Sequence, residues 1–587
     1  MMFPYPSAEG LHVGNVYAFT GADIYGRFMA MNGRDVFEPM GFDAFGIHSE
    51  NFAIKKGIHP NQLTTRNVER FRETQLKRIG DRFCWNHEIQ TTSPAYYKWT
   101  QWIFLQLFKA GLAERKKASV NWCPSCKTVL ADEQVIAGEC ERCSAIAIQR
   151  ELEQWFFKIT RYAQRLLDNL EHLDWSERVK TAQRNWIGRS ERDGTVQYHL
   201  RDWLISRQRY WGPPIPIIYC QTCGTVPVPE DQLPVELPQT QDWLPKGTGN
   251  SPLADILEFV NTTCPCCGGA ARRETDVSDN FLDSAWYFLR YPSSNCSDVP
   301  FDPQITATWL PVDMYIGGAE HSVLHLLYSR FITMVLHDLG YIPFEEPFRC
   351  FRAHGLLTKD GAKMSKSKGN VVNPDQYIEE YGADTLRTYL MFLGPYDQGG
   401  DFSDRGIAGI RRFLNRVWQL AIAHQDSIQS NELDVESQRG LHQTIYKVRA
   451  DILALKYNTA IATLMTYLNT LEAKEQLSQA EIKSYVLMLA PFAPHITEEL
   501  WSRMGESYSI HQQPFPQANP EFLAQAQVRI AVQINGRTRT TLQLAPDASQ
   551  EEAIALAMQS ESVQRYINHQ EVRRVVYVPG RIINLVI

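Results

Sequence analysis

The residues best suited to chemistry lie in two short motifs, far apart in the chain. The first is His12-Val13-Gly14-Asn15, which comes directly before a stretch with apolar residues at helical spacing. A helix N-terminus offers unpaired N–H groups and a positive dipole end, and a glycine lets a ligand approach the backbone. The second is Lys363-Met364-Ser365-Lys366-Ser367, with two lysines on a loop flanked by Gly and Ser. Each motif alone is weak, but together they predict a triphosphate site in which the lysines hold the β- and γ-phosphates.

The cysteines predict metal sites. Eight of the 12 cysteines form four CxxC pairs, a pattern that indicates zinc rather than disulfides in an intracellular chain. Four thiolates leave no open coordination position, so we expect structural zinc; a site that no longer binds metal is the alternative. The expected ligands are Cys123, Cys126, Cys140 and Cys143 in one site and Cys220, Cys223, Cys264 and Cys267 in the other, where Cys266 is an alternative ligand.

Three further segments carry candidate binding residues. Asp43 follows a strand end, where a carboxylate can bind an ammonium group or cap the next helix. Another apolar strand runs into Gly317-Gly318 and then Glu320, His321 and His325. The two histidines are spaced for a metal, but no third ligand is evident. In a third segment, WLISRQRYWG, Arg207 and Arg209 beside aromatic residues suit a phosphate or a nucleotide face, or else form a solvated basic loop.

Length and composition limit the class of protein. A chain of 587 residues with 44% hydrophobic content can build several packed domains. A net charge of -7 argues against nonspecific coating of nucleic acid, though not against local basic patches. We see no apolar run of ~20 residues and no signal peptide, so we expect a cytoplasmic protein without a membrane span. Only Met1 precedes Met2-Phe3-Pro4, where a nucleotide-binding sheet normally has a full strand, so we expect a misplaced start; a sheet that has lost an edge contribution is the alternative.

The patterning also predicts secondary structure. We expect a strand ending at Pro4 and Pro6, and helices over Tyr97–Leu112 and Arg150–Arg189. Further helices are expected over Arg411–His424, Leu441–Leu471 and Glu481–Met504, with Pro491 and Pro494 punctuating the last. The last segment, Val528–Ile587, alternates as strands around one helix, Ser549–Tyr566, and carries arginines at 529, 537, 539, 573, 574 and 581.

The two motifs together resemble the signature sequences of class I aminoacyl-tRNA synthetases, with HVGN at the first and KMSKS at the second. The stretches GFDAFGIHSEN, NWCPSC, QRNWIGRS, LRDWLISRQRYWG and MYIGGAEHSVLHLLYSRF are similar to the bacterial-type leucyl-tRNA synthetases. The resemblance implies an α/β fold: a Rossmann-like parallel-sheet catalytic domain with zinc-module insertions, an α-helical anticodon-binding bundle and a small α+β C-terminal domain.

The family implies activation of leucine with ATP and Mg²⁺, then transfer to tRNA(Leu) by a monomer. His12, Asn15, Lys363 and Lys366 would be catalytic. Because Asn15 replaces the second histidine of the family motif and carries no charge, we expect a reduced rate. ATP would also contact Gly14, Gly317, Gly318, Glu320, Met364, Ser365 and Ser367, whereas the amino-acid pocket would comprise Met2, Phe3, Tyr5, Asp43, His321 and His325.

The resemblance also predicts domain boundaries. They are 1–120 and 276–404 for the two catalytic halves, 121–150 for a zinc knuckle, 151–275 for a connective region with the second zinc module, 405–520 for the anticodon-binding bundle and 526–587 for the C-terminal tRNA-binding domain.

The sequence departs from the family at two places. Ile47-His48-Ser49 replaces the usual Leu-Pro-Ala, which alters the wall of the pocket. Where leucyl enzymes insert a hydrolytic editing domain, only Glu191 to His199 fills the gap, so we expect no post-transfer editing. A hydrophobic pocket separates substrates that differ by one methylene by only ~10–200-fold. The pocket must therefore be unusually selective, the cell must tolerate errors, or another enzyme carries translation.

Two other functions fit the same residues. One is a paralogue that activates leucine or a related aliphatic amino acid for a non-translational pathway, and charging of tRNA distinguishes it. The other is a non-catalytic RNA-binding regulator, against which the intact lysines of KMSKS argue.

Overall fold

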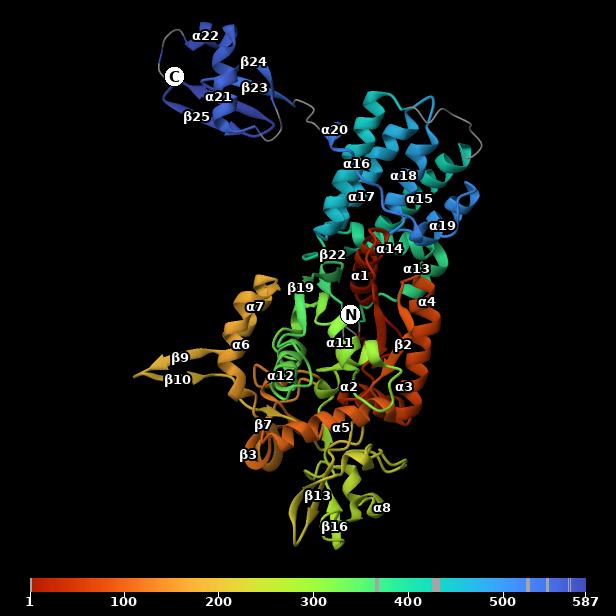
Figure 1. The fold of residues 1–587 in the computed structure, drawn as a ribbon, viewed down its shortest axis with the longest axis vertical. Coiled ribbons are helices and arrows are strands. Elements are labelled where there is room, and N and C mark those ends of the chain that lie inside the picture. The colour runs from red at the N-terminus through yellow and green to blue at the C-terminus, as the bar shows by residue number, and fades with distance from the viewer. Residues whose placement is uncertain are drawn as a thin grey trace.

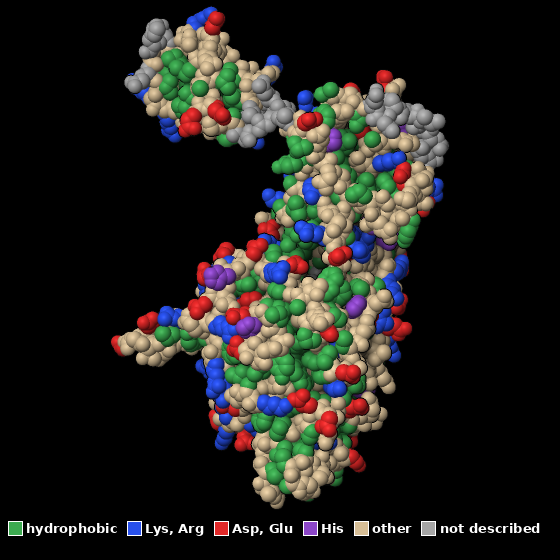
Figure 2. Space-filling view, viewed as in Figure 1, with side chains coloured by type: hydrophobic (Ala, Val, Ile, Leu, Met, Phe, Trp, Pro, Cys, Tyr) green, Lys and Arg blue, Asp and Glu red, His purple; other side chains and the backbone are tan. Residues whose placement is uncertain are grey.

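The computed structural model describes residues 3–364, 369–424, 433–523, 528–544, 548–567, 570 and 572–587, without the side chains of residues 133, 320 and 528. It consists of an α/β body with two small inserted modules, a helical bundle above the body, and an α+β unit at the C-terminal end (Figure 1). This is the predicted fold class, which is confirmed. Basic and acidic side chains are interspersed over the face in Figure 2.

The α/β body is built on parallel strand pairs. β1 (Pro39–Phe42) pairs with β2 (Cys84–Gln90). β18 (Val312–Gly318) pairs with β19 (Phe348–His354), which also pairs with β8 (Asp174–Trp175). Short strands β20 (Leu356–Lys359), β21 (Ala362–Lys363) and β22 (Gly399–Phe402) extend toward the bundle. The helices of the body are α1 (Val13–Met31), α2 (Ile47–Lys56), α3 (Pro60–Glu69), η1 (Arg70–Leu76), α4 (Lys77–Ile79), α5 (Pro94–Lys109), α9 (Asn280–Asp283), α10 (Tyr287–Arg290), α11 (Pro303–Trp309) and α12 (His325–Asp338).

Among the described residues, which begin at Phe3, the strand expected at Pro4 and Pro6 is not formed. The segment is extended without ladder pairing, because two prolines remove backbone donors there. It is held instead by the N–H of Asp43, which donates to the carbonyl of Pro4 (3.0 Å), and by the amide of Asn67, which donates to the carbonyl of Pro6 (2.9 Å).

Two cysteine-bearing modules are inserted in the body. The first lies on the sheet of β3 (Ala113–Cys123), β4 (Thr128–Leu130), β7 (Ile148–Phe157) and β11 (Trp203–Leu204), with β5 (Val135–Ile136) and β6 (Glu139–Cys140) beside it. The second has β13 (Ile217–Cys220), β14 (Gly224–Pro227), β15 (Asn261–Thr263), β16 (Ala270–Arg273) and α8 (Leu257–Val260).

Because β7 occupies the beginning of the segment Arg150–Arg189, the helical prediction for that segment is wrong at its start. Along β7 exposure alternates before the buried residues that end the strand, which is a strand pattern.

After β7 the chain forms α6 (Ala163–Asn169) and α7 (Glu177–Ile187). Then comes a hairpin of β9 (Arg189–Arg192) and β10 (Thr195–Tyr198), which projects from the body in Figure 1. Its strands are exposed apart from Tyr198, which is half-buried.

The helical bundle follows α13 (Pro374–Tyr381) and α14 (Ala383–Phe392). It contains α15 (Asp404–Ala423), α16 (Val435–Leu453), α17 (Tyr457–Glu472), α18 (Gln479–Leu489) and α19 (Pro494–Arg503), and α20 (Pro520–Leu523) packs near α16. The helix expected over Leu441–Leu471 is interrupted, and the segment Glu481–Met504 is divided at its prolines as predicted. Leu455 has a positive φ of 55°, and Pro494 begins a new helix.

The C-terminal unit is a four-stranded sheet in the order β24 (Arg537–Leu544), β23 (Val528–Ile534), β26 (Ile582–Val586), β25 (Arg574–Val578). Two helices, α21 (Gln550–Gln559) and α22 (Glu561–Ile567), replace the single helix that was expected. Among the described residues, no helix is long and apolar enough to cross a membrane.

Helix α1 lies between two hydrophobic cores and connects them. Ala18 and Phe19 pack in the core that contains Met40 and Phe42 of β1. Other residues of α1, including Val16, pack in a second core shared with the bundle. The helix is therefore fixed both to the parallel sheet and to the domain above it.

A buried charge cluster reinforces this joint. Arg387 of α14 is 0% exposed and forms ion pairs with Asp23 of α1 and with Asp81, both also 0% exposed. Arg27 pairs with Asp23 from the next turn of α1. Removing one partner of such a cluster leaves a buried charge uncompensated, which typically costs about 3–5 kcal/mol.

We therefore expect Arg387→Met to lower the midpoint of the first thermal unfolding transition. The matched control is Arg352→Met, because Arg352 pairs with Asp174 at exposed fractions of 36% and 70%. Such a surface pair is worth about 0–1 kcal/mol, so this variant should unfold close to the parent. Equal midpoints for the two variants in calorimetry would contradict the buried role of Arg387.

Candidate active site

One pocket of about 400 Å³ collects most of the predicted site residues. Its wall includes Phe3, Tyr5, His12, Gly14, Asn15, Gly317, Gly318, His321, His325, Lys363 and Met364. Met2, Ser365, Lys366 and Ser367 lie outside the described residues, as does the side chain of Glu320. Asp43 lies behind the wall rather than in it. The two motifs that are distant in sequence thus open on the same cavity.

The HVGN turn forms the N-terminus of α1. Nδ1 of His12 accepts a hydrogen bond from the N–H of Gly14 (3.1 Å), and Oδ1 of Asn15 accepts one from the N–H of His12 (3.2 Å). This capping box leaves the proton of a neutral His12 ring on Nε2. A Cβ at Gly14 would lie 2.9 Å from the ring, so a larger residue would displace His12. The first turn of α1 has no acidic residue, which favours an anionic ligand.

Hydrogen bonds join this turn to the segment that follows KMSKS. The N–H of Val13 donates to the carbonyl of Val372 (3.0 Å). The amide of Gln75 accepts from the N–H of Leu11 (2.8 Å) and donates to the carboxylate of Asp375 (2.8 Å). Lys363 itself is placed by β21, where it pairs with Thr358 of β20. The lysine loop therefore begins and ends at backbone that is fixed next to α1.

An aromatic recess forms another part of the pocket. Phe3 stacks on Tyr287 with ring centroids 4.4 Å apart, and Tyr315 and His325 lie beside them. Burial, together with His321, lowers the pKa of His325 to about 3, so its ring is neutral at physiological pH. A recess of neutral rings suits an apolar side chain.

Sequence reasoning missed Ser284, Tyr287 and Tyr315, which also line the pocket. Ser284 and Tyr287 belong to the segment DNFLDSAWYFLRY, and Tyr315 belongs to MYIGGAEHSVLHLLYSRF. Hydroxyl groups within an apolar run were the available signal.

Asp43 is fully buried near the recess. Neither of its carboxylate oxygens has a hydrogen-bond partner of normal geometry within the described part of the chain, although Tyr5, Asn280 and Thr91 surround it. Burial raises the pKa of Asp43 well above its ordinary value, and Asp279 adds to the effect. A buried, unpaired carboxyl group next to a pocket is a candidate for binding a cation.

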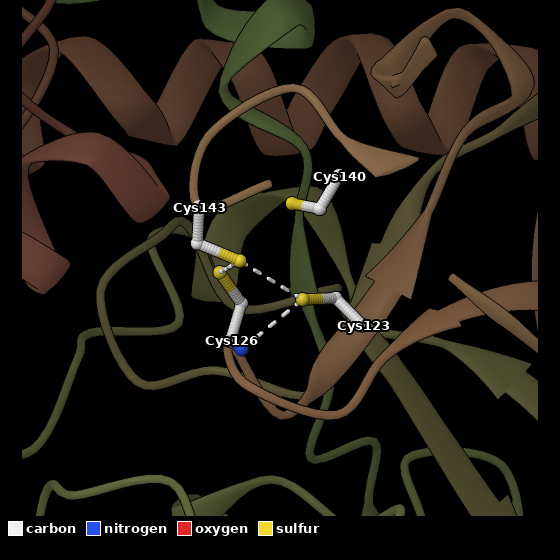
Figure 3. A group of neighbouring side chains, drawn as sticks. All are labelled: Cys123, Cys126, Cys140 and Cys143. Atoms are coloured by element: carbon white, nitrogen blue, oxygen red, sulfur yellow. Dashed lines mark hydrogen bonds between the residues drawn. The ribbon is translucent and has the colours of Figure 1, made fainter. Parts of the chain in front are cut away.

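The eight predicted zinc ligands gather in two groups of four. In each group the Sγ atoms all lie within 4.8 Å of one another. Sγ of Cys143 is 3.4 Å from Cys123 and 3.6 Å from Cys126, and Figure 3 shows the four side chains of the first group converging. Sγ of Cys220 is 3.6 Å from Cys267, whereas Cys266 is not in the second group. A zinc ion with four Zn–S bonds of about 2.3 Å fits both sets.

The expectation that Arg207 and Arg209 face phosphate or solvent is wrong. Their side chains are only 2% and 1% exposed. Arg207 pairs with Asp279 and Arg209 with Glu50, and neither arginine lines the pocket.

Comparison with known families assigns the class. Residues 1–403 match the family described as tRNA synthetases class I (I, L, M and V), and residues 438–555 match the anticodon-binding domain of tRNA ligase. A methionyl-tRNA synthetase of Mycobacterium tuberculosis has the same fold, with a TM-score of 0.62, 18% identity, and coverage of 93% of this chain and 99% of the other. The chain belongs to the class I aminoacyl-tRNA synthetases.

Individual relatives are more specific. The leucine–tRNA ligase of Thermotoga maritima is 39% identical over 100% of this chain and 96% of its own length. That of Clostridium perfringens is 37% identical, with 100% and 95% covered. A leucyl-tRNA synthetase of Agrobacterium radiobacter K84, solved with tRNA and LeuAMS, superimposes with a TM-score of 0.89 at 33% identity, covering 100% of this chain and 95% of that one. Within this class, the chain belongs to the leucyl-tRNA synthetase family.

The pocket yields a test of Asp43. The pKa of this acid is higher in the folded protein than in the unfolded chain, where it is about 4. Its ionisation therefore makes the fold less stable as the pH rises above about 4. We therefore expect Asp43→Asn to be at least as stable as the parent at pH 8, with a smaller or no advantage at pH 4. The same variant should lose leucine activation, by ~100-fold or more, because its amide cannot neutralise an ammonium group.

Thermal unfolding at the two pH values, together with leucine-dependent ATP–pyrophosphate exchange, checks both parts. Asp283→Asn is the control: Asp283 is also fully buried with its pKa raised by burial, but one of its carboxylate oxygens already accepts a hydrogen bond from the hydroxyl of Thr100 (2.9 Å). It should reproduce the stability effect without the same loss of activation. An unchanged leucine KM in Asp43→Asn would refute the assignment.

Proposed function

We propose that this enzyme condenses leucine with ATP to leucyl-adenylate and transfers the leucyl group to tRNA(Leu) without post-transfer editing. The observation that carries the proposal is the single pocket in which His12 at the start of α1 faces the same space as Lys363. The aromatic recess in the same pocket offers room for an aliphatic side chain.

In the first step a carboxylate oxygen of leucine attacks the α-phosphorus of ATP. The bond between the α-phosphorus and the bridging oxygen breaks, and pyrophosphate leaves with the electron pair. Catalysis of such a step consists mainly of positioning and of stabilising negative charge. We assign His12, Lys363 and Lys366 to the phosphates, with Gly14 and Asn15 shaping the turn. Asp43 would hold the ammonium group. Mg²⁺ would neutralise charge on the phosphates when bound.

In the second step the 2′-hydroxyl of the terminal adenosine of tRNA attacks the carbonyl carbon of the adenylate, and AMP leaves. We assign the bundle, residues 405–520, to the anticodon stem, and residues 526–587 to the elbow of the tRNA. The family match to an anticodon-binding domain supports the first assignment. We also propose that the enzyme is a monomer and that its other domains have the boundaries predicted from the sequence.

The loss of editing is supported by the connection between α7 and β11. This connection holds only the short hairpin β9–β10 and a few residues around it. The alignment with the Thermotoga maritima ligase extends over 791 positions, whereas this chain has 587 residues. We also propose one zinc ion in each four-cysteine group. Its chemistry is structural, since four thiolates fill the coordination sphere.

Two assays test the function. Leucine should support ATP–pyrophosphate exchange and charging of total tRNA. Leucine, isoleucine, norvaline and methionine are then offered separately. A mischarged tRNA, such as norvalyl-tRNA(Leu), should accumulate and should hydrolyse no faster with the enzyme than without it. Accelerated hydrolysis would overturn the editing proposal alone. Exchange without charging would instead support the paralogue, and absence of exchange would overturn the function.

A further inference from the structure

The segment Arg207–Gly212 is buried between the first cysteine group and the amino-acid side of the pocket. Its alternate side chains, Arg207, Arg209 and Trp211, are 2%, 1% and 4% exposed. Arg209 contacts α2, Arg207 contacts Asp279 before α9, and Trp211 contacts the loop that contains Asp43. Both arginines also contact the module that carries the cysteines. The segment therefore lies where the two sites can influence each other.

Arg209 contacts both sites with a single guanidinium group. Its Nε donates to the carboxylate of Glu50, and its Nη2 donates to Oδ1 of Asn51 (2.7 Å); both partners are on α2. Its Nη1 donates to the backbone carbonyl of Cys126, one of the four cysteines in Figure 3. Asn51 also donates to Sγ of Cys126 (3.6 Å). The planar guanidinium thus fixes α2 relative to the turn that supplies one proposed zinc ligand.

Arg207 makes a second connection of the same kind. It pairs with Asp279, the residue at the N-terminus of α9, and α9 leads directly to Ser284 in the wall of the pocket. Its Nη2 also donates to Oε1 of Gln134 (3.3 Å). Gln134 is fully buried and lies in the chain between Cys126 and Cys140.

Trp211 holds the loop that contains Asp43. Its indole Nε1 donates to the carbonyl of Ala44 (2.9 Å), and its own carbonyl accepts from the N–H of Gly46 (3.1 Å). Gly46 has φ of 100°, and a Cβ there would lie 2.7 Å from the side chain of Asn280, so the loop is tightly fitted. α2 begins at the next residue, Ile47.

We propose that the Arg207–Gly212 segment couples the first cysteine group to the amino-acid pocket, with Arg209 as the positioning residue. Zinc bound to Cys123, Cys126, Cys140 and Cys143 fixes the carbonyl of Cys126, and through Arg209 it fixes α2 and the loop carrying Asp43. Loss of the metal releases that carbonyl and leaves a buried guanidinium N–H without an acceptor. Because binding energies are reciprocal, bound leucine must in turn strengthen the retention of zinc. The inference rests on the proposed function, since it takes leucine as the ligand.

The test measures zinc release from the full-length enzyme into excess chromogenic chelator, with leucine, with glycine or with no amino acid. Leucine should slow one phase of release by about tenfold, the usual size of an effect transmitted to a metal through neighbouring hydrogen bonds, while glycine should not. In Arg209→Lys the compact ammonium cannot reach all three acceptors, so the leucine effect should disappear. The leucine KM of this variant should rise about tenfold while kcat stays within about twofold.

Arg330→Lys is the matched control. Arg330 is a fully buried arginine that pairs with Glu346 and bonds the carbonyl of Leu166. Its replacement should cost stability yet keep the leucine effect on zinc release. If Arg209→Lys does not fold, Asn51→Ala removes one connection from the half-buried surface of α2 and should reduce the leucine effect.

Release that is the same with and without leucine in the parent enzyme would overturn the coupling. So would a leucine effect that persists in Arg209→Lys. ATP–pyrophosphate exchange by the parent separates this failure from that of the proposed function. If the parent enzyme shows leucine-dependent ATP–pyrophosphate exchange but leucine does not change its zinc release, only the coupling is refuted. If there is no leucine-dependent exchange, leucine is not the ligand and both proposals are refuted.

Discussion

The structure depends on holding two loops from distant parts of the chain against one cavity. A triphosphate carries more negative charge than one helix N-terminus can stabilise, so a second cationic segment must meet it there. The hydrogen bond from Val13 to Val372 and the bridge of Gln75 between Leu11 and Asp375 hold the two segments together. With the two segments held in this way, the N-terminus of α1 and Lys363 both line the pocket.

The rest of the architecture can be understood from the burial of α1. A helix whose N-terminus must stay open to a ligand is anchored along its body instead, by two cores and by the pair of Asp23 with Arg387. In contrast to α1, the wall of the pocket has behind it a carboxyl group whose charge its surroundings do not stabilise. Asp43 is buried without a hydrogen-bond partner of normal geometry among the described residues, which costs stability in the empty enzyme; under the proposed function, the ammonium group of leucine would offset that cost.

Features defined by local spacing could be predicted from the sequence, and features defined by distant partners could not. The CxxC pairs and the HVGN turn act through neighbouring residues, so their positions followed from the motifs. Arg207 and Arg209 gave no sign of their ion pairs, because Asp279 and Glu50 lie 72 and 159 residues away. Periodicity alone cannot assign the strand β7, because its buried end, Gln154 to Phe157, has no alternation. The part of the lysine loop that contains Lys366 lies outside the described residues.

The central claim is that the histidine turn and the lysine loop close on one nucleotide. The most direct measurement is a crystal structure of the enzyme with a non-hydrolysable ATP analogue and leucine. The account predicts phosphate oxygens within hydrogen-bond reach, about 2.7–3.2 Å, of both His12 and Lys363, with the α-phosphate facing the aromatic recess. Phosphates bound by only one of these two residues, or outside the pocket, would contradict it.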